Sequence, residues 1–281
     1  MRLLILGDSH GHLDRVHGLL TVAVEHLHID AAIQVGDFGF FPRTMSRFVT
    51  RFGRFPVPLH VIDGNHEDHC WLRTQMLDGI AATWPDRHRL EYHPRGTATI
   101  IGGATIGFLG GAWHVDRPQE GADIYWRRGE EPMACNWIRP SDRDRALVAW
   151  RDTPPDLIVT HSAPTGVGVG VPGEPARVPD VHEFIDSRGW SAGPLTDVGE
   201  PELGSIARHL PWPTGRTWVF GHFHRLHDHK VAGTRFVCVG SSDGSDGRKH
   251  PAVIIYDTIT KSLTADLDGW PSDLLTRIEE F

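Results

Sequence analysis

Acidic and imidazole side chains follow short apolar runs at five places along the chain. The runs span residues 3–6, 31–35, 59–62, 157–160 and 217–220. If the runs are strands of an open α/β sheet, the residues that follow them meet at its carboxyl edge, where ligands bind. Glycines at 7, 36, 64 and 221 allow close backbone approach there. The side chains delivered to that edge are Asp8, His10, Asp37, Asn65, His66, His161, His222 and His224.

This set of residue types favours a metal site. Asp8 and His10 are two positions apart, as are His222 and His224, and in an extended segment such pairs point to the same side. Oxygen and imidazole donors suit Mn, Fe or Zn better than Ca, which prefers all-oxygen coordination. Each motif alone is more often a turn than a ligand pair. Five of them, each after an apolar run, indicate one metal centre.

The elements that must position these residues alternate along the chain. Apolar residues at helical spacing predict helices over 13–27, 43–54, 67–77 and 141–151, the last with Ser141 as its N-cap. Further strands are expected at 103–109, 235–239 and 252–256. Strand–helix alternation implies parallel pairing with right-handed crossovers. The last two strands have no helix between them, so we expect the second half to end in antiparallel strands.

The order of these motifs resembles the calcineurin-like metallophosphoesterase superfamily. The resemblance covers about residues 1–260, and its motifs are D-x-H, G-D, G-N-H-[DE], H and G-H-x-H, in this order. The resemblance implies an α/β fold of the α/β/β/α type, with two mixed sheets flanked by helices. It also implies a dinuclear centre of divalent or trivalent Mn, Fe or Zn, with Asp37 bridging. One metal would be bound by Asp8, His10, Asp37 and His224, and the other by Asp37, Asn65, His161 and His222.

The resemblance implies hydrolysis of a phosphate ester by metal-bound hydroxide. Only Asp8 and Asp37 carry charge among the seven ligands, so two divalent ions leave a net charge near +2, which attracts a phosphate. His66 matches the family motif but is not a metal ligand. It is our candidate for protonating the leaving oxygen, and its alternative role is to orient the turn at Asn65.

The substrate is less constrained than the reaction. Residues 36–43 partly resemble the Gly-Asp-x-x-Asp-Arg-Gly motif of Ser/Thr protein phosphatases, but the second acid is absent and Arg43 is displaced. Arg43, His114 and Asp116 are candidates for substrate contacts. No arginine cluster for a dianionic monoester is visible, which favours a phosphodiester, nucleotide-like substrate. The alternatives are a phosphomonoesterase or protein phosphatase, a nuclease, and an idle binding scaffold.

Length and composition limit the remaining classes. The chain has 281 residues, 40% of them apolar, which fits one domain over 1–281 with elaborated loops at about 112–140 and 163–201. A net charge of −8 disfavours bulk binding of nucleic acid. No apolar run approaches the roughly 18–20 residues of a membrane span. The three cysteines are scattered without a metal or disulfide pattern, so we expect a cytoplasmic enzyme whose partner is a small phosphoester.

Overall fold

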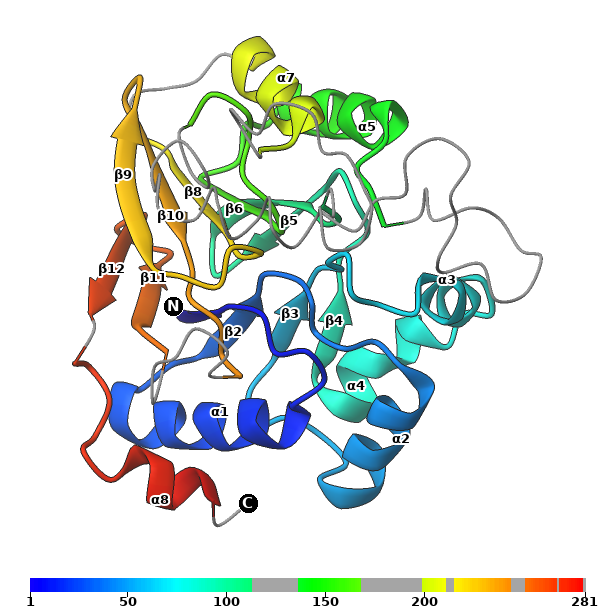
Figure 1. Ribbon diagram of the computed structural model, residues 1–281, viewed down its shortest axis with the longest axis vertical. Coiled ribbons are helices and arrows are strands. Elements are labelled where there is room, and N and C mark those ends of the chain that lie inside the picture. Colours follow the sequence, from blue (N-terminus) through cyan, green and yellow to red (C-terminus); the bar gives the residue numbers. More distant parts are fainter. Residues whose placement is uncertain (113–135, 168–198, 211–214, 244–250, 267, 280–281) are drawn as a thin grey trace, which may run out of the picture.

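Two mixed β-sheets face each other, and helices cover their outer faces (Figure 1). The structure, a computed structural model, describes residues 1–112, 136–167, 199–210, 215–243, 251–266 and 268–279. The observed layers are helix, sheet, sheet and helix, which confirms the α/β sandwich that the sequence motifs imply.

The first sheet carries three of the five predicted site segments. Its order is β12-β11-β1-β2-β3-β4. The strands β1, β2, β3 and β4 pair in parallel, while β11 and β12 pair antiparallel. Their bounds are β1 Arg2–Leu6, β2 Ala31–Gln34, β3 Leu59–Val61, β4 Leu90–Tyr92, β11 Val253–Asp257 and β12 Ser262–Asp266.

The second sheet carries the remaining two segments. Its order is β5-β6-β7-β8-β10-β9, with β6, β7, β8 and β10 parallel and the two edge strands antiparallel. The bounds are β5 Thr97–Ile101, β6 Ala104–Leu109, β7 Leu157–Thr160, β8 Thr217–Phe220, β9 His227–Val231 and β10 Thr234–Cys238. The antiparallel pairs β9–β10 and β11–β12 fit the expectation for the second half of the chain.

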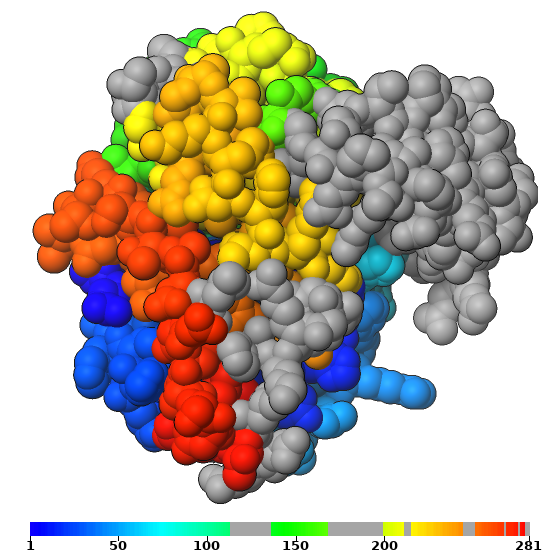
Figure 2. All heavy atoms as spheres, turned by 60° about the vertical axis from the view of Figure 1, so that its left-hand side comes forward, coloured from blue at the N-terminus to red at the C-terminus, as the bar shows by residue number. Residues whose placement is uncertain are grey.

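Helices pack on the outer face of each sheet. The first sheet is covered by α1 Leu13–Leu27, α2 Pro42–Arg51, α3 His69–Leu77, α4 Trp84–His88 and α8 Leu274–Glu279, with a 3-10 turn at Ala81–Thr83. The second sheet is covered by α5 Pro140–Arg151 and α7 Pro201–His209. At the C-terminus, α8 packs against α1, and Figure 2 shows this red segment on the surface below the orange strands.

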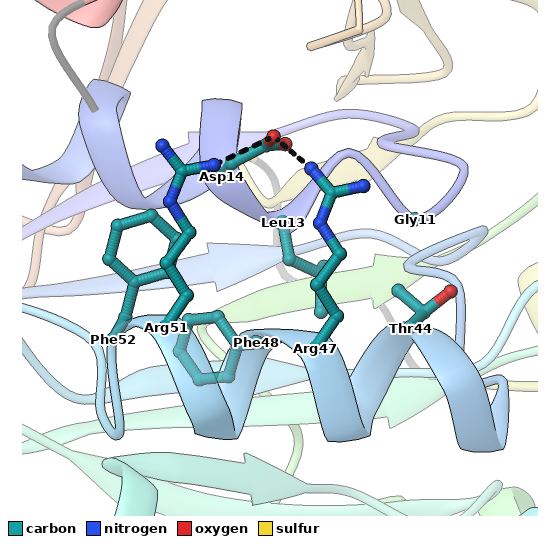
Figure 3. A pocket seen from close by; sticks show the side chains of 8 residues that line it. All are labelled: Gly11, Leu13, Asp14, Thr44, Arg47, Phe48, Arg51 and Phe52. Carbon is teal, nitrogen blue, oxygen red and sulfur yellow. Dashed lines mark hydrogen bonds and ion pairs between the residues drawn. The ribbon is translucent and has the colours of Figure 1, made fainter.

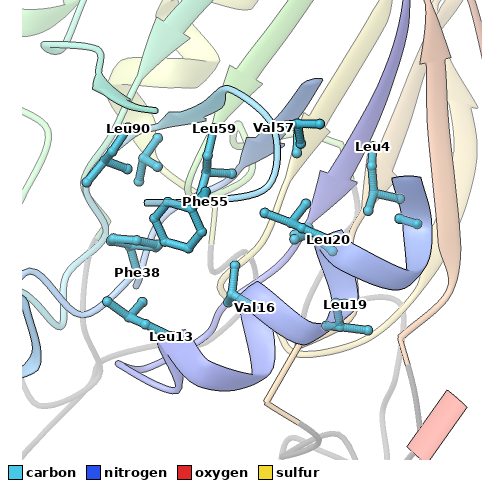
Figure 4. Packing of buried hydrophobic residues seen from close by; sticks show 14 of the residues in the cluster. Leu4, Leu13, Val16, Leu19, Leu20, Phe38, Phe55, Val57, Leu59 and Leu90 are labelled. Atoms are coloured by element: carbon cyan, nitrogen blue, oxygen red, sulfur yellow. The ribbon is translucent and has the colours of Figure 1, made fainter. Parts of the chain in front are cut away.

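Alternation along the strands divides the apolar residues between the layers. In β1, Leu4 and Leu6 face the helices, whereas Leu3 and Ile5 face the other sheet. Figure 4 shows Leu4 beside Leu20 of α1. Full burial of such a side chain contributes about 1.5–3 kcal/mol. Both faces of the sheet are therefore buried, which fixes the register and, with it, the positions of the loops that follow the strands.

Three helix starts differ from the predictions. The helix predicted over 43–54 begins at Pro42 and ends at Arg51. The helix predicted from Ser141 begins at Pro140, and its N-cap is Arg139, so the Ser141 cap was wrong. Proline is favoured at the first helical position because it lacks the N–H that would be unsatisfied there. The helix predicted from residue 67 begins at His69, because the Asp68 side chain caps it by accepting the backbone N–H of Trp71.

Several predictions fall on segments outside the described residues. Most of the predicted loops at 112–140 and 163–201 lie there, and so do His114 and Asp116. The extent of the loops and the single-domain organisation therefore stay predictions. None of the helices in the described part of the chain combines the length and hydropathy needed to cross a membrane.

Candidate metal centre

The loops that follow β1, β2, β3, β7 and β8 bring the predicted ligands to one buried place between the two sheets. Asp8, Asp37, Asn65 and His161 are each at most 3% exposed. The strands β7 and β8 end directly before His161 and Gly221, and β1 ends two residues before Asp8. The predicted convergence at the carboxyl ends of the strands is therefore present in the structure.

One group of ligand atoms comes from Asp8, His10 and His224. His224 Nε2 lies 3.0 Å from Asp8 Oδ2 and 3.0 Å from His10 Nε2. One ligand atom from each residue fits within a set in which all separations are at most 4.8 Å. These three side chains can therefore direct two imidazole nitrogens and a carboxylate oxygen at one ion.

A second group comes from Asp8, Asp37 and His161, again with ligand atoms within 4.8 Å of one another. His161 Nε2 lies 3.4 Å from Asp37 Oδ1 and 3.1 Å from Asn65 Oδ1. The other oxygen of Asp37, Oδ2, lies 3.9 Å from His10 Nδ1. The Asp37 carboxylate thus directs one oxygen to His161 and the other to the ring of His10, and Asp8 is the acid that both groups share.

His222 reaches the centre from the loop after β8. Its backbone N–H donates to Asp8 Oδ1 over 3.1 Å, and its ring centroid lies 5.2 Å from that of His161. The structure therefore places His222 beside the second group.

The backbone around the centre is strained. His10, Asp37, His222 and His224 all have positive φ, between 45° and 67°. A residue other than glycine in this region loses roughly 1–2 kcal/mol. Non-glycine residues cluster in such conformations at functional sites, where the surrounding structure holds them in place. Four of the seven predicted ligands share this feature.

Two glycines allow the carboxylates to lie close to neighbouring backbone. A Cβ at Gly64 would lie 2.0 Å from Asp37 Oδ1, and a Cβ at Gly221 would lie 2.3 Å from Asp8 Oδ1. Real Cβ atoms essentially never approach this closely, so any side chain at either position would displace an acid of the centre.

The charges of the centre are balanced among carboxylates and histidines. Burial opposes ionisation of Asp37, but the nearby His161 outweighs it and holds the pKa of Asp37 well below its usual value. Burial also opposes the charge of His161, and Asp37 and Asp8 raise its pKa to about 10 in the absence of metal. The ion-pair partners of Asp8 and Asp37 in the described residues are all histidines. A bound cation would replace the histidine protons as the counter-charge of the two acids.

The donor set fits divalent metals. Two carboxylates, an amide oxygen and four imidazoles come together in the loops around the centre. Burial and the nearby Asp37 both oppose ionisation of Asp8, but His224 and His161 outweigh them and lower the pKa of Asp8 below its usual value. Two acids that repel each other in a buried place are suited to share cations, and oxygen and imidazole donors of this kind suit Mn, Fe or Zn.

His66, the predicted proton donor, lies at the rim of the centre. Its side chain is exposed, and its ring centroid lies 5.4 Å from that of His10. Its backbone N–H donates to Asp37 Oδ1 over 2.8 Å. The imidazole is therefore next to the ligand cluster and open to a substrate from solvent.

Glu67 is a positioning residue that the sequence analysis did not single out. Its carboxylate accepts the backbone N–H groups of Phe38, Gly39 and Phe40 at 2.8, 2.9 and 2.5 Å. It thereby ties the loop that carries Asp37 to the loop that carries Asn65. Its place in the G-N-H-E motif is the signal that could have revealed it.

A buried ion pair supports the Asn65 loop from the other side. Asp63 Oδ2 accepts Arg95 Nε over 2.8 Å, and Asp63 Oδ1 accepts the hydroxyl of Tyr92 over 3.0 Å. Burial opposes the charge of Asp63, but the Arg95 guanidinium lowers its pKa below the usual value. Arg95 also donates to the carbonyl of Trp137, so the pair links β3 to the segment that precedes α5.

The predicted substrate contacts are less well placed. Arg43 is exposed in the first turn of α2, while His114 and Asp116 lie outside the described residues. A shallow pocket between the start of α1 and α2 begins at Gly11, next to His10, and Figure 3 shows Arg47 and Arg51 both directed at Asp14 there. Arg47 pairs with Asp14 over 2.7 Å, so the arginines are matched by an acid within the pocket.

Comparison with known proteins agrees with this geometry. Residues 1–226 match the family model of the calcineurin-like phosphoesterases. The crystal structure of TT1561 from Thermus thermophilus is similar, with a TM-score of 0.56, 14% identity, and coverage of 95% of this chain and 98% of that one. A structure described as a novel archaeal phosphodiesterase aligns with a TM-score of 0.42 at 12% identity, over 94% of this chain and 98% of that one. No curated protein matches the chain. From the family match over most of its length, the chain belongs to the calcineurin-like phosphoesterase family.

Proposed function

We propose that this protein is a metal-dependent phosphodiesterase that hydrolyses a small, nucleotide-like phosphodiester at a dinuclear centre. The observation that carries the proposal is the buried convergence of Asp8, Asp37 and His161 with His10 and His224. Carboxylates in such a place need cations, and the family to which the chain belongs is one of phosphoesterases.

Seven side chains would hold two ions of Mn, Fe or Zn. Asp37 is the proposed bridge, as the family resemblance implies, because one of its oxygens lies near His161 and the other near His10. The complete proposed set is Asp8, His10, Asp37, Asn65, His161, His222 and His224. When bound, such ions lower the pKa of water toward neutrality and offset charge on phosphoryl oxygens.

Residues of the chain would shield the metal ligands from water and protonate the leaving oxygen of the substrate. Burial of Asp8 and Asp37 excludes bulk water from the ligand side of the centre. We assign to His66, which is exposed beside His10, the donation of a proton from its imidazole to the leaving oxygen. Proton transfer of this kind typically contributes 10²–10⁴-fold to the rate.

The charges around the centre favour a diester over a monoester. A dianionic monoester gains from additional fixed cations such as arginine forks. In the described residues, no arginine or lysine is an ion-pair partner of Asp8 or Asp37. A singly charged diester fits a centre whose two acids pair with histidines in the described part of the chain.

The test is turnover of the Mn²⁺-loaded protein on an aryl phosphodiester and on the corresponding aryl phosphomonoester. We expect a higher kcat/KM for the diester, and loss of both activities in Asp8→Asn. A higher kcat/KM for the monoester would overturn the diester assignment. No turnover of either ester by the metal-loaded protein would overturn the enzyme assignment. Cyclic nucleotides and single-stranded DNA, added as competitors and as substrates, separate a nucleotide diesterase from a nuclease.

A further inference from the structure

A second cluster of metal-binding residue types lies at the open edge of the first sheet, apart from the proposed dinuclear centre. It consists of His60 on β3, Glu91 on β4 and His93 just after β4. Their ligand atoms lie within 4.8 Å of one another. None of the three belongs to the family motif described above.

Strand register places the cluster in the layer between the two sheets. His60 pairs with Ile33 on one side and with Glu91 on the other. Ile33 belongs to the apolar core between the sheets, whereas Leu59 and Val61 face the helices, so His60 and Glu91 point into the inter-sheet layer. His93 stacks on Phe108 of the opposite sheet with ring centroids 4.0 Å apart. Three polar residues therefore replace apolar ones at the edge of this core.

The distances suit a single ion of the zinc type. His60 Nδ1 lies 2.9 Å from His93 Nε2 and 3.3 Å from Glu91 Oε2. Two ligands at about 2.0–2.1 Å from a tetrahedral ion are roughly 3.3–3.4 Å apart. The 2.9 Å between imidazole nitrogens also resembles the 3.0 Å between His10 and His224 in the dinuclear centre. Small side-chain shifts would thus be enough to admit an ion.

Burial and charge agree with metal binding. His60 and His93 are 7% and 3% exposed, and burial lowers the pKa of His93 to about 4, which keeps its imidazole neutral, as a ligand must be. The Glu91 side chain is 43% exposed, and no arginine or lysine pairs with it in the described part of the chain. Because β4 is the edge strand of the first sheet, an ion can enter past Glu91 from solvent.

We propose that His60, Glu91 and His93 form a mononuclear site for a borderline divalent transition metal such as Zn²⁺, separate from the dinuclear centre. Two imidazoles and one carboxylate leave a coordination position open for water. The bound ion would join β3 to the segment after β4 and so stabilise the edge of the sandwich.

The test is metal stoichiometry of the full-length protein titrated with Zn²⁺, together with the visible spectrum of the Co²⁺ form. The variants are Glu91→Gln and His93→Gln, and His26→Gln on the exposed face of α1 is the matched control. We expect Glu91→Gln to lose one metal equivalent, or to bind it at least 10–100-fold more weakly, with phosphoesterase turnover unchanged. The Co²⁺ absorption of that site and the rise in Tm on adding Zn²⁺ should be lost with it.

The same titration separates this site from the dinuclear centre. Asp37→Asn should lose metal at the dinuclear centre and keep the equivalent held by His60, Glu91 and His93. Suppose instead that Glu91→Gln and His93→Gln bind as much Zn²⁺ as the unchanged protein, with the same Kd. In that case the three residues only hydrogen-bond to one another, and the proposal is wrong. That result would leave the dinuclear centre unaffected.

Discussion

The backbone N–H of His66 donates to Asp37 Oδ1 over 2.8 Å, so the loop after β3 is tied to the acid of the loop after β2. The Asp37 carboxylate therefore makes two kinds of contact. It holds the His66 loop in place and, with its remaining lone pairs, faces His161 and His10. Substitutions at these two residues can separate metal binding from proton transfer.

Asp37→Asn tests the bridging role. The carboxamide oxygen can still accept the N–H of His66, so the loop should keep its geometry, but the charge and one of the two ligand oxygens are lost. We expect the variant to fold, with an unchanged far-UV circular dichroism spectrum. Its affinity for metal should be at least about 100-fold lower. Elemental analysis after gel filtration measures this. Full metal content in the variant would show that Asp37 is not a ligand.

His66→Ala tests the proton donor. Because His66 is placed beside the ligands rather than among them, the variant should keep its full metal content and lose about 10²–10⁴-fold in kcat. The loss should be larger for an ester of a basic alcohol than for one of an acidic phenol, since an acidic leaving group needs no proton. An equal loss for both leaving groups would point instead to a role in orienting the Asn65 turn.

The sequence predicts the central strands well because each is a run of apolar residues buried on both faces. The runs at 157–160 and 217–220 are strands β7 and β8 with the same bounds. The four edge strands β4, β5, β9 and β12 were not predicted. β9, with the sequence HDHKV, is half-exposed and mostly polar, so no alternation marks it as a strand. Tertiary pairing decides such segments, and the chain alone does not display it.

In the candidate site, too, some residues could be identified from the sequence and others could not. The ligands could be identified from the sequence because each lies in the loop that follows a strand and has a ligand residue type. Glu67 could have been identified from its place in the G-N-H-E motif. Arg95 could not, because it acts through hydrogen bonds to Asp63 and to the backbone of a distant loop, which leave no spacing in the sequence. The cluster of His60, Glu91 and His93 depends on the register between β3 and β4, and β4 is another strand that the sequence pattern does not mark.

Glu67→Gln should destabilise the loops that hold the dinuclear centre. Each carboxylate oxygen of Glu67 accepts at least one backbone N–H, and glutamine would turn an NH₂ group toward one of these donors. A buried donor left unsatisfied costs about 1–3 kcal/mol. Urea unfolding should show a loss of this size, whereas Glu25→Gln, at an exposed ion pair with Arg277, should change the free energy of unfolding by less than about 1 kcal/mol. Burial and the nearby Asp37 raise the pKa of Glu67 to about 8, so the comparison is made at pH 9, where the side chain is ionised. Unchanged stability at that pH would show that the three N–H groups do not depend on the carboxylate.

The stability of the protein should fall on acidification, in part because of His69. Burial lowers the pKa of His69 to about 4, as does the nearby Arg95, while Asp63 opposes the shift. The unfolded chain, with a pKa near 6.5, therefore binds a proton between pH 6.5 and 4 that the folded protein does not. The contribution of neutral His69 to the free energy of unfolding is complete above pH 6.5 and is lost as the pH falls toward 4. The loss is about 3 kcal/mol at most.

The measurement for His69 is the free energy of unfolding of His69→Gln and of the unchanged protein at pH 7, 6, 5 and 4.5. The difference between the two should shift in favour of the variant by about 1 kcal/mol per pH unit below 6, since glutamine takes up no proton on unfolding. The exposed His26→Gln variant is the matched control for loss of an imidazole. A constant difference for His69→Gln as well would show that His69 is protonated in the folded protein, with Asp63 as its counter-charge.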